Sequence, residues 1–285
     1  MTAALATVAA VTPAGWQAAL NLYFERSGAR SILARRSHVG PLHVQRPFYP
    51  EGDDTCHVYI LHPPGGVVGG DQLRITIDVA TGAQALLTTP AAGKLYRSAG
   101  RLATFDQRLT VATDAMLEWL PQESIVFAGA HVAASTRVDL AGTAKFLGWE
   151  LVCLGRPAAG ERFTQGALRQ RFEVWRDGAP LWIEGSRFGG GETALDAAWG
   201  LRGHSVTGTL VCTSTAPDLV TQVREAWTAL AGDALVSATQ LDAVVVCRYL
   251  GDDAQQARAF FVAAWTILRP AVLGRAACPP RIWAT

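Results

Sequence analysis

The segment of the sequence most unusual for chemistry is the glycine-rich run at residues 63–71. Four glycines within six positions let the backbone adopt positive φ angles or approach another chain closely. A phosphate-binding loop of the Walker type needs Lys and then Ser or Thr after its last glycine, but Asp71 and Gln72 stand there, and an acid repels phosphate. Residues 89–95 lack the first glycine and the closing Ser or Thr of such a loop. We therefore do not expect this chain to bind a nucleotide.

Two histidines, His57 and His62, flank the predicted strand at residues 58–61, with Cys56 beside them. Metal sites built from Cys and His cluster their ligands at short spacing, and the sequence has no second pair of this kind. Ordinary polar residues at the ends of a strand are the simpler interpretation. A β-structured hydrolase that uses Asp71 with His57 or His62 as acid and base stays open as an alternative, although the sequence has no Gly-x-Ser-x-Gly motif.

Acidic residues inside apolar runs are a second candidate for chemistry. Glu118, Glu150 and Glu184 each stand in or directly after such a run. Burying a carboxylate is costly unless an arginine, a metal or water meets it. One interpretation is a set of arginine–carboxylate pairs, since Lys94 and Lys145 are the only lysines and arginines supply the other basic side chains. The other is an internal hydrated passage for a divalent cation, because oxygen ligands alone bind nickel or zinc weakly, as transfer requires.

The elements that must position these residues are mostly strands. From about residue 15 to 208, short apolar or alternating runs are broken by Gly, Pro and Asp at intervals of about ten residues, which predicts a β structure. Asp177-Gly178 predicts a hairpin turn, and residues 185–191 are the best candidate for a mobile loop. After residue 208 the pattern predicts, in order, a strand at 210–213, a helix at 219–230, a strand at 243–250 and a helix at 253–268 that ends before Pro270.

The fold class expected from this pattern is mainly β, with two helices near the C-terminus. We find no internal sequence repeat and no low-complexity linker. One domain is therefore expected over residues 1–285, with a β-rich part at 15–208 and a strand, helix, strand, helix tail at 209–285.

Composition limits the classes of function. Only 17% of the 285 residues are charged, 49% are hydrophobic and the net charge is +1. This composition excludes a disordered chain and argues against a nucleic-acid partner. So little charge, together with nine tryptophans, indicates a surface that partner proteins cover. A carbohydrate-binding β module that exposes its tryptophans is a further alternative.

The compartment expected is the cytoplasm. The first basic residue is Arg26, so residues 1–11 lack the positive region of a secretory signal, and no apolar run is long enough to span a membrane. Five widely spread cysteines fit reduced, buried thiols better than a disulfide framework. We expect a soluble protein without a membrane partner.

Several long segments occur in an order that is specific to one protein family. They are residues 40–52, 56–71, 87–90, 94–98, 117–123, 148–157 and 280–283. Together they resemble the urease accessory protein UreD (UreH) family over nearly the whole chain. The resemblance implies a mostly β structure whose sheets are stacked in a helical arrangement, with two helices toward the C-terminus.

The resemblance also implies a function. It is that of a non-enzymatic chaperone for urease maturation, which delivers nickel into the urease apoprotein through an internal tunnel. UreF is expected to bind this chain directly, the GTPase UreG through UreF, and the urease apoprotein on another face. No cofactor is expected to be tightly bound, because nickel is in transit.

Particular residues follow from the same resemblance. It assigns transient contact with nickel to Asp71, Glu150 and Glu184, which match acidic positions of the family. Where relatives often have Ser or Thr before Lys94, this sequence has Gly93. That difference widens a passage and removes a polar group from its lining.

Overall fold

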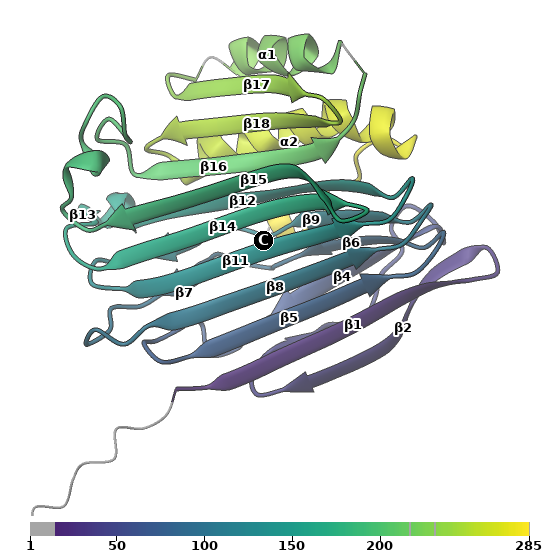
Figure 1. Ribbon diagram of the computed structural model, residues 1–285, viewed down its shortest axis with the longest axis horizontal. Coiled ribbons are helices and arrows are strands. Elements are labelled where there is room, and N and C mark those ends of the chain that lie inside the picture. The colour runs from purple at the N-terminus through teal and green to yellow at the C-terminus, as the bar shows by residue number, and fades with distance from the viewer. Residues whose placement is uncertain (1–14, 217, 231, 285) are drawn as a thin grey trace, which may run out of the picture.

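A computed structural model describes residues 15–216, 218–230 and 232–284. Residues 1–11, considered above as a possible signal, lie outside the described residues. Strands dominate the structure and form two stacked sheets, with a helical layer at the C-terminal end (Figure 1). The predicted fold class is thus confirmed.

One sheet has seven strands. Their spatial order is β15 (Ala179–Gly189), β14 (Ala167–Arg176), β11 (His131–Leu140), β8 (Ala103–Val111), β5 (Gln72–Val79), β1 (Gln17–Ser27) and β2 (Arg30–Val39).

The other sheet has eleven strands. Its main path is β17 (Leu235–Leu241), β18 (Val244–Gly251), β16 (Val206–Thr213), β12 (Lys145–Arg156), β9 (Met116–Leu120), β6 (Gln84–Thr88), β4 (Thr55–Leu61) and β3 (His43–Val44). Beside this path lie β7 (Gly93–Leu95), β10 (Ser124–Val126) and β13 (Glu161–Arg162). The helices are α1 (Leu219–Leu230), α2 (Ala254–Leu273) and the short 3-10 turns η1 (Pro157–Ala159), η2 (Thr193–Leu195) and η3 (Arg281–Ala284).

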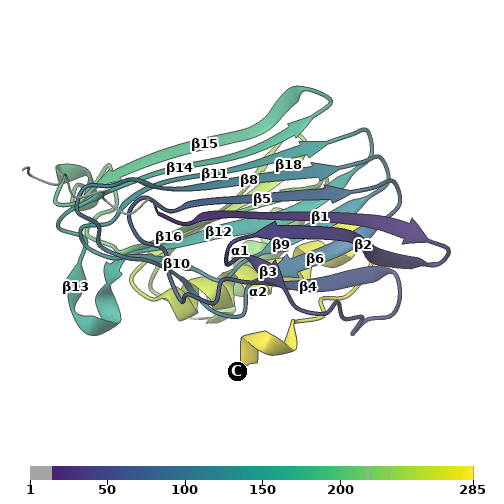
Figure 2. The same ribbon diagram turned by 90° about the horizontal axis from the view of Figure 1, so that it is seen from below.

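From β4 to β14 the chain passes back and forth between the two sheets. The strands β4, β6, β9 and β12 pair in parallel in one sheet, and β5, β8, β11 and β14 pair in parallel in the other. Each coil of the chain therefore adds one strand to each sheet, and Figure 2 shows the two resulting layers one above the other. Parallel neighbours need a crossover connection, and here the strand of the opposite sheet supplies it.

A turn with the same closing hydrogen bond recurs between consecutive coils. Each copy closes with a backbone hydrogen bond of 3.0 Å between two alanines, and the three pairs are Ala80–Ala83, Ala112–Ala115 and Ala141–Ala144. The second alanine of each pair is fully buried. Between the alanines lies one residue with positive φ, which is Gly82, Asp114 or Gly142. The recurring segment is only four residues long, and the strands on either side differ in sequence, so it does not stand out in the sequence.

Two cores hold the layers together, and β12 contributes to both. Phe146, Val152 and Leu154 pack in the core between the sheets. Trp149 and Leu151 belong to the core beneath α1 and α2. Because alternate residues of a strand point to opposite faces, a strand buried on both faces is a continuous apolar run. Glu150 interrupts this run on the face toward the seven-stranded sheet.

The C-terminal region differs from the prediction in two elements. A strand that we did not predict, β17, pairs with β18 through a tight turn at Asp242, so the tail is strand, helix, strand, strand, helix. Only Ala238 of β17 is buried, which explains its weak pattern. Helix α2, whose N-cap is Asp253, continues through the exposed Pro270 instead of ending before it.

Other local predictions divide in the same way. The hairpin at Asp177-Gly178 is confirmed, because it joins β14 and β15. The prediction of a mobile loop at 185–191 is wrong, since residues 185–189 belong to β15 and pair with β14.

All five cysteines are free and four are buried. In the described ranges, no helix is long and apolar enough to cross a lipid bilayer.

Candidate functional site

Glu150 of β12 lies in the space between the two sheets. Its carboxylate oxygens accept hydrogen bonds from Thr136 of β11 and Gln170 of β14, which both belong to the facing sheet. No basic side chain pairs with Glu150 within the described part of the chain. Burial raises its pKa, against the two hydrogen bonds, and the neighbouring Glu184 raises it further. Between the sheets there is thus a half-buried carboxyl group that no basic side chain of the described residues meets.

Three adjoining cavities run past this carboxyl group. The largest, about 390 Å³, lies beside the glycine-rich segment and is lined by residues that include His62, Gly93, Lys94 and Gln107. The second, about 80 Å³, shares Gln107 with the first cavity and is lined in addition by Glu150. The third, about 40 Å³, begins at Glu150 and Gln170. A water molecule needs about 10–15 Å³ of such space, so each cavity can hold water.

Glu184 lies on the far side of the third cavity from the glycine-rich segment. It stands on β15 and lines this cavity together with Glu150, Thr207 and Thr209. One of its oxygens lies 3.5 Å from Nη2 of Arg248, and 27% of its side chain is exposed. The structure therefore brings two of the predicted acids, Glu150 and Glu184, to one cavity.

Asp71, the third predicted acid, is placed elsewhere. It is buried directly before β5, and its two oxygens accept the backbone N–H groups of Trp16 at 2.8 Å and Val68 at 2.9 Å. None of the three cavities is lined by Asp71. Its carboxylate thus ties the glycine-rich segment to the start of β1.

The glycines of this segment serve close packing. A Cβ on Gly66 would lie 2.2 Å from the ring of Tyr96, and one on Gly70 would lie 2.3 Å from the guanidinium of Arg101. Gly70 also has a φ of 98°, which L side chains rarely adopt. Larger residues would therefore force this part of the chain apart.

The two histidines do not form a common site. Nε2 of His57 lies 2.6 Å from an oxygen of Glu51. His62 lines the largest cavity, and burial lowers its pKa while the charge of Asp71 raises it in part. Both oxygens of Asp71 already accept backbone N–H groups, so the geometry does not favour the hydrolase alternative.

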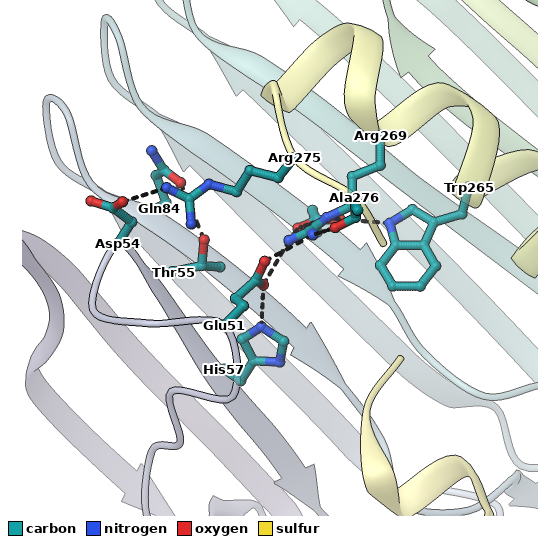
Figure 3. Close-up of polar contacts among 10 residues, drawn as sticks. Glu51, Asp54, Thr55, His57, Gln84, Trp265, Arg269, Arg275 and Ala276 are labelled. Atoms are coloured by element: carbon teal, nitrogen blue, oxygen red, sulfur yellow. Dashed lines mark hydrogen bonds and ion pairs between the residues drawn. The ribbon is translucent and has the colours of Figure 1, made fainter. Parts of the chain in front are cut away.

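Glu118, in contrast to Glu150, belongs to a buried arginine–carboxylate network. Arg269 of α2 is fully buried and donates from Nε and Nη2, both at 3.0 Å, to the oxygens of Glu118. The same guanidinium donates to both oxygens of Glu51, at 2.7 and 2.8 Å, and Figure 3 shows it reaching from α2 toward Glu51 and His57. For Glu118 the structure confirms the interpretation as an arginine–carboxylate pair.

The network fixes the charge of Glu51. Burial alone would raise the pKa of this carboxyl, but the hydrogen bonds from His57 and Arg269 outweigh burial and lower the pKa to about 2. Sequence reasoning missed both Glu51 and Arg269. One feature of the sequence could have indicated Arg269: it stands among the apolar residues on the buried face of a helix, between Trp265 and Val272.

The polar partners of Glu150 were missed as well. Thr136, Gln107 and Gln170 stand on strands of the seven-stranded sheet with their side chains between the sheets, and Oγ1 of Thr136 lies 2.9 Å from Oε1 of Gln107. The sequence could have indicated these residues, because each is polar at a strand position where the alternation of the neighbouring residues predicts an apolar side chain. Among the described residues, no three His, Cys, Asp or Glu side chains gather closely enough to hold a metal ion.

The tryptophans do not form an aromatic binding face. Of the nine, all of which are described, only Trp16 and Trp199 are exposed, at 56% and 77%. Such a distribution argues against the carbohydrate-binding alternative.

Comparisons with known proteins agree on one family. A family model described as UreD urease accessory protein matches residues 17–284. A urease accessory protein UreD of Azoarcus sp. is 51% identical over 273 residues, which are 95% of each chain. A protein of Brucella anthropi named urease accessory protein UreD 2 is 46% identical over 95% of this chain and 99% of its own, and a UreD of Pseudomonas fluorescens is 45% identical over 98% and 99%. With the match extending over both sheets and the helical layer, the chain belongs to the UreD family of urease accessory proteins.

Proposed function

We propose that this chain is a non-enzymatic chaperone for urease maturation, which works in the cytoplasm and delivers nickel into the urease apoprotein. Membership in a family of urease accessory proteins supports this role. UreF is the direct partner in this proposal, UreG acts through UreF, and the urease apoprotein receives the metal. Nickel is the cargo and not a resident cofactor.

The route in this proposal is the series of cavities between the sheets. Adjoining cavities share lining residues, from Gly93 and Lys94 near the glycine-rich segment, past Glu150, to Glu184. Side-chain oxygens of Gln107, Thr136 and Glu150 follow one another along this route. Oxygen ligands bind nickel weakly enough to release it again, since strong sites for this metal use imidazole or thiolate.

The single observation that supports the proposal most is the unpaired carboxyl group of Glu150. Glu118 is buried more deeply than Glu150, but it forms an ion pair with Arg269. Glu150 instead receives only neutral donors, which leaves an attraction for a cation that enters the cavities. In this proposal Asp71 supports the fold beside the route and does not contact nickel, because both oxygens of its carboxylate accept backbone N–H groups.

The experiment replaces Glu150 by Leu and measures the nickel content of urease matured with the variant. We expect a several-fold lower nickel content, while the variant still copurifies with UreF and UreG. Asp53→Leu is the control, because Asp53 is exposed and lines none of the three cavities. Urease with normal nickel content in the Glu150→Leu strain would contradict the route.

A further inference from the structure

The outer face of the seven-stranded sheet, which points away from the cavities, carries a hollow of about 610 Å³ walled by arginines. Three of them line it, Arg169 and Arg171 on β14 and Arg187 on β15. All three side chains are exposed. We call this feature the arginine hollow.

The arginines stand where their charges repel one another. Arg169 is the direct register partner of Arg187 on the neighbouring antiparallel strand, and Arg171 lies two residues further along the same face. Like charges directly opposite one another destabilise a sheet. The arrangement therefore costs stability, which a ligand of opposite charge would restore.

The protein's own carboxylates leave this charge partly uncancelled. Arg171 pairs with Glu173, and Arg187 lies 3.5 Å from Glu192. Arg169 pairs with no carboxylate in the described part of the chain. Asp106 also lines the hollow, but Arg74 and Arg108 hold it at 3.4 and 3.3 Å.

Small residues make the floor of the hollow. Ala133 is the register partner of Arg169, and Arg171 stands between Ser135 and Gly185 on its two neighbouring strands. A Cβ on Gly185 would meet nothing within 4 Å. The small side chains beside Arg169 and Arg171 leave the exposed guanidinium groups room to meet a ligand.

We propose that the arginine hollow binds an acidic segment of a partner protein in an extended conformation. Alternate side chains of an extended chain are about 6.6 Å apart, a spacing that Arg169 and Arg171 share because they are two residues apart on one strand. Guanidinium groups bind carboxylates through two parallel hydrogen bonds. Glutamates or aspartates at alternate positions of the partner can therefore meet successive arginines.

Charge complementarity favours a peptide over a nucleic acid. Nucleic-acid binding rests on many phosphate contacts, whereas the hollow offers three arginines and contains the carboxylate of Asp106. The whole chain has a net charge of only +1. This inference does not depend on nickel delivery, because the hollow lies on the opposite face of the sheet from the cavities.

The test measures binding of the full-length chain to a fluorescent decapeptide of alternating glutamate and serine. We expect it to bind more tightly than the matched glutamine–serine peptide, with an affinity that falls as salt rises. The double variant Arg169→Glu/Arg187→Glu should lose at least tenfold in affinity. Gly185→Trp should weaken binding as well, because it fills the hollow while leaving every arginine in place.

Arg36→Glu is the control, because Arg36 is exposed on β2 at the far edge of the same sheet. Its affinity for the glutamate peptide should stay within twofold of wild type. Equal binding of the two peptides, or an equal loss in Arg36→Glu and the double variant, would overturn the proposal. So would tighter binding of a ten-nucleotide single-stranded DNA than of the glutamate peptide.

Discussion

At the scale of single residues, two enclosed glutamates have opposite roles because of what faces them. Glu118 accepts hydrogen bonds from Arg269 and, at 2.6 Å, from the indole N–H of Trp265, so a buried cation faces its charge, although burial still raises its pKa. Glu150 receives a hydroxyl and an amide, which satisfy its hydrogen bonds but leave its charge. Replacing the carboxylate by a neutral amide should therefore stabilise the protein at Glu150 and destabilise it at Glu118.

We expect Glu150→Gln to raise the free energy of unfolding by about 1 kcal/mol at pH 8. The pKa of Glu150 is raised in the folded state, so the stability that its protonated form contributes is present below pH 4.5 and lost as pH rises through the folded pKa. The gain from Gln should thus be small at pH 5 and grow toward pH 8. Urea denaturation at both pH values measures it.

Glu118→Gln is the matched comparison and should lower the free energy of unfolding by about 3 kcal/mol, because it leaves part of the charge of Arg269 unbalanced in the interior. If both glutamine variants changed stability in the same direction, the distinction between the two acids would be wrong.

Sequence reasoning reached these residues but not their partners. An acid in an apolar run is visible without a structure, and for Glu118, Glu150 and Glu184 it was informative. Arg269 lies 151 positions from Glu118, and the two meet only because α2 packs against the sheet that contains β9. Asp71 was selected by the resemblance, but its contacts depend on the distant Trp16.

At the scale of elements, the fold depends on short turns that return the chain to the other sheet. The alanine pairs close these turns, and the fully buried second alanine leaves no room for a larger side chain. Strand composition predicted the β class, and the helical spacing of apolar residues predicted α1. The missed β17 shows the limit of pattern reasoning, because an edge strand with one buried residue has little apolar alternation.

Pro270 within α2 supplies a prediction for an element. Proline removes a backbone donor from a helix and clashes with the preceding turn, yet α2 continues to Leu273. Because Pro270 is exposed, Pro270→Ala should raise the free energy of unfolding by about 1–2 kcal/mol, after the greater freedom of the unfolded chain is subtracted. Thermal unfolding followed by circular dichroism measures the change.

A lower stability in Pro270→Ala would show that the last turn of α2 depends on the bend at proline. Just beyond that turn, the carbonyl oxygen of Ala276 accepts a hydrogen bond from the Arg269 guanidinium. Thr266→Ala, at an exposed position one turn earlier, is the control for a gain in helix propensity without a proline; it also removes the 2.8 Å hydrogen bond from Oγ1 to the carbonyl oxygen of Val262.

At the scale of the whole molecule, the coiled chain places polar side chains in the space between its two sheets. Each coil adds one inward-facing strand to each sheet, so polar residues on successive coils lie next to one another across the sheet. Gln107, Thr136 and Gln170 stand on three consecutive strands, β8, β11 and β14, and they meet Glu150 from the opposite sheet. The sequence predicted inward acids, but it did not predict this row, since the register between coils depends on loops of unequal length.

The cavity beside the glycine-rich segment offers a way to separate a block of the proposed route from damage to the fold. Gly93 lines this cavity, and a Cβ added to it would come no closer than 3.8 Å, to Oγ of Ser124. Larger side chains at residue 93 can therefore enter the cavity without displacing backbone. We expect the nickel content of urease matured with Gly93→Ala, Gly93→Leu and Gly93→Trp variants to fall in that order, with alanine near wild type.

This order of effects distinguishes obstruction from a change in charge, because none of the three substitutions alters a carboxylate. The unfolding temperatures and the amounts of copurified UreF should stay close to wild type across the series, since residue 93 lies on the short strand β7 and its backbone N–H still bonds to the carbonyl of Glu123 at 2.8 Å. If Gly93→Trp delivered as much nickel as Gly93→Ala, the cavity beside the glycine-rich segment would not be part of the route. The proposed route would then be confined to the two cavities lined by Glu150, and it would require substitutions at Thr207 or Thr209 of the third cavity to reduce the nickel content.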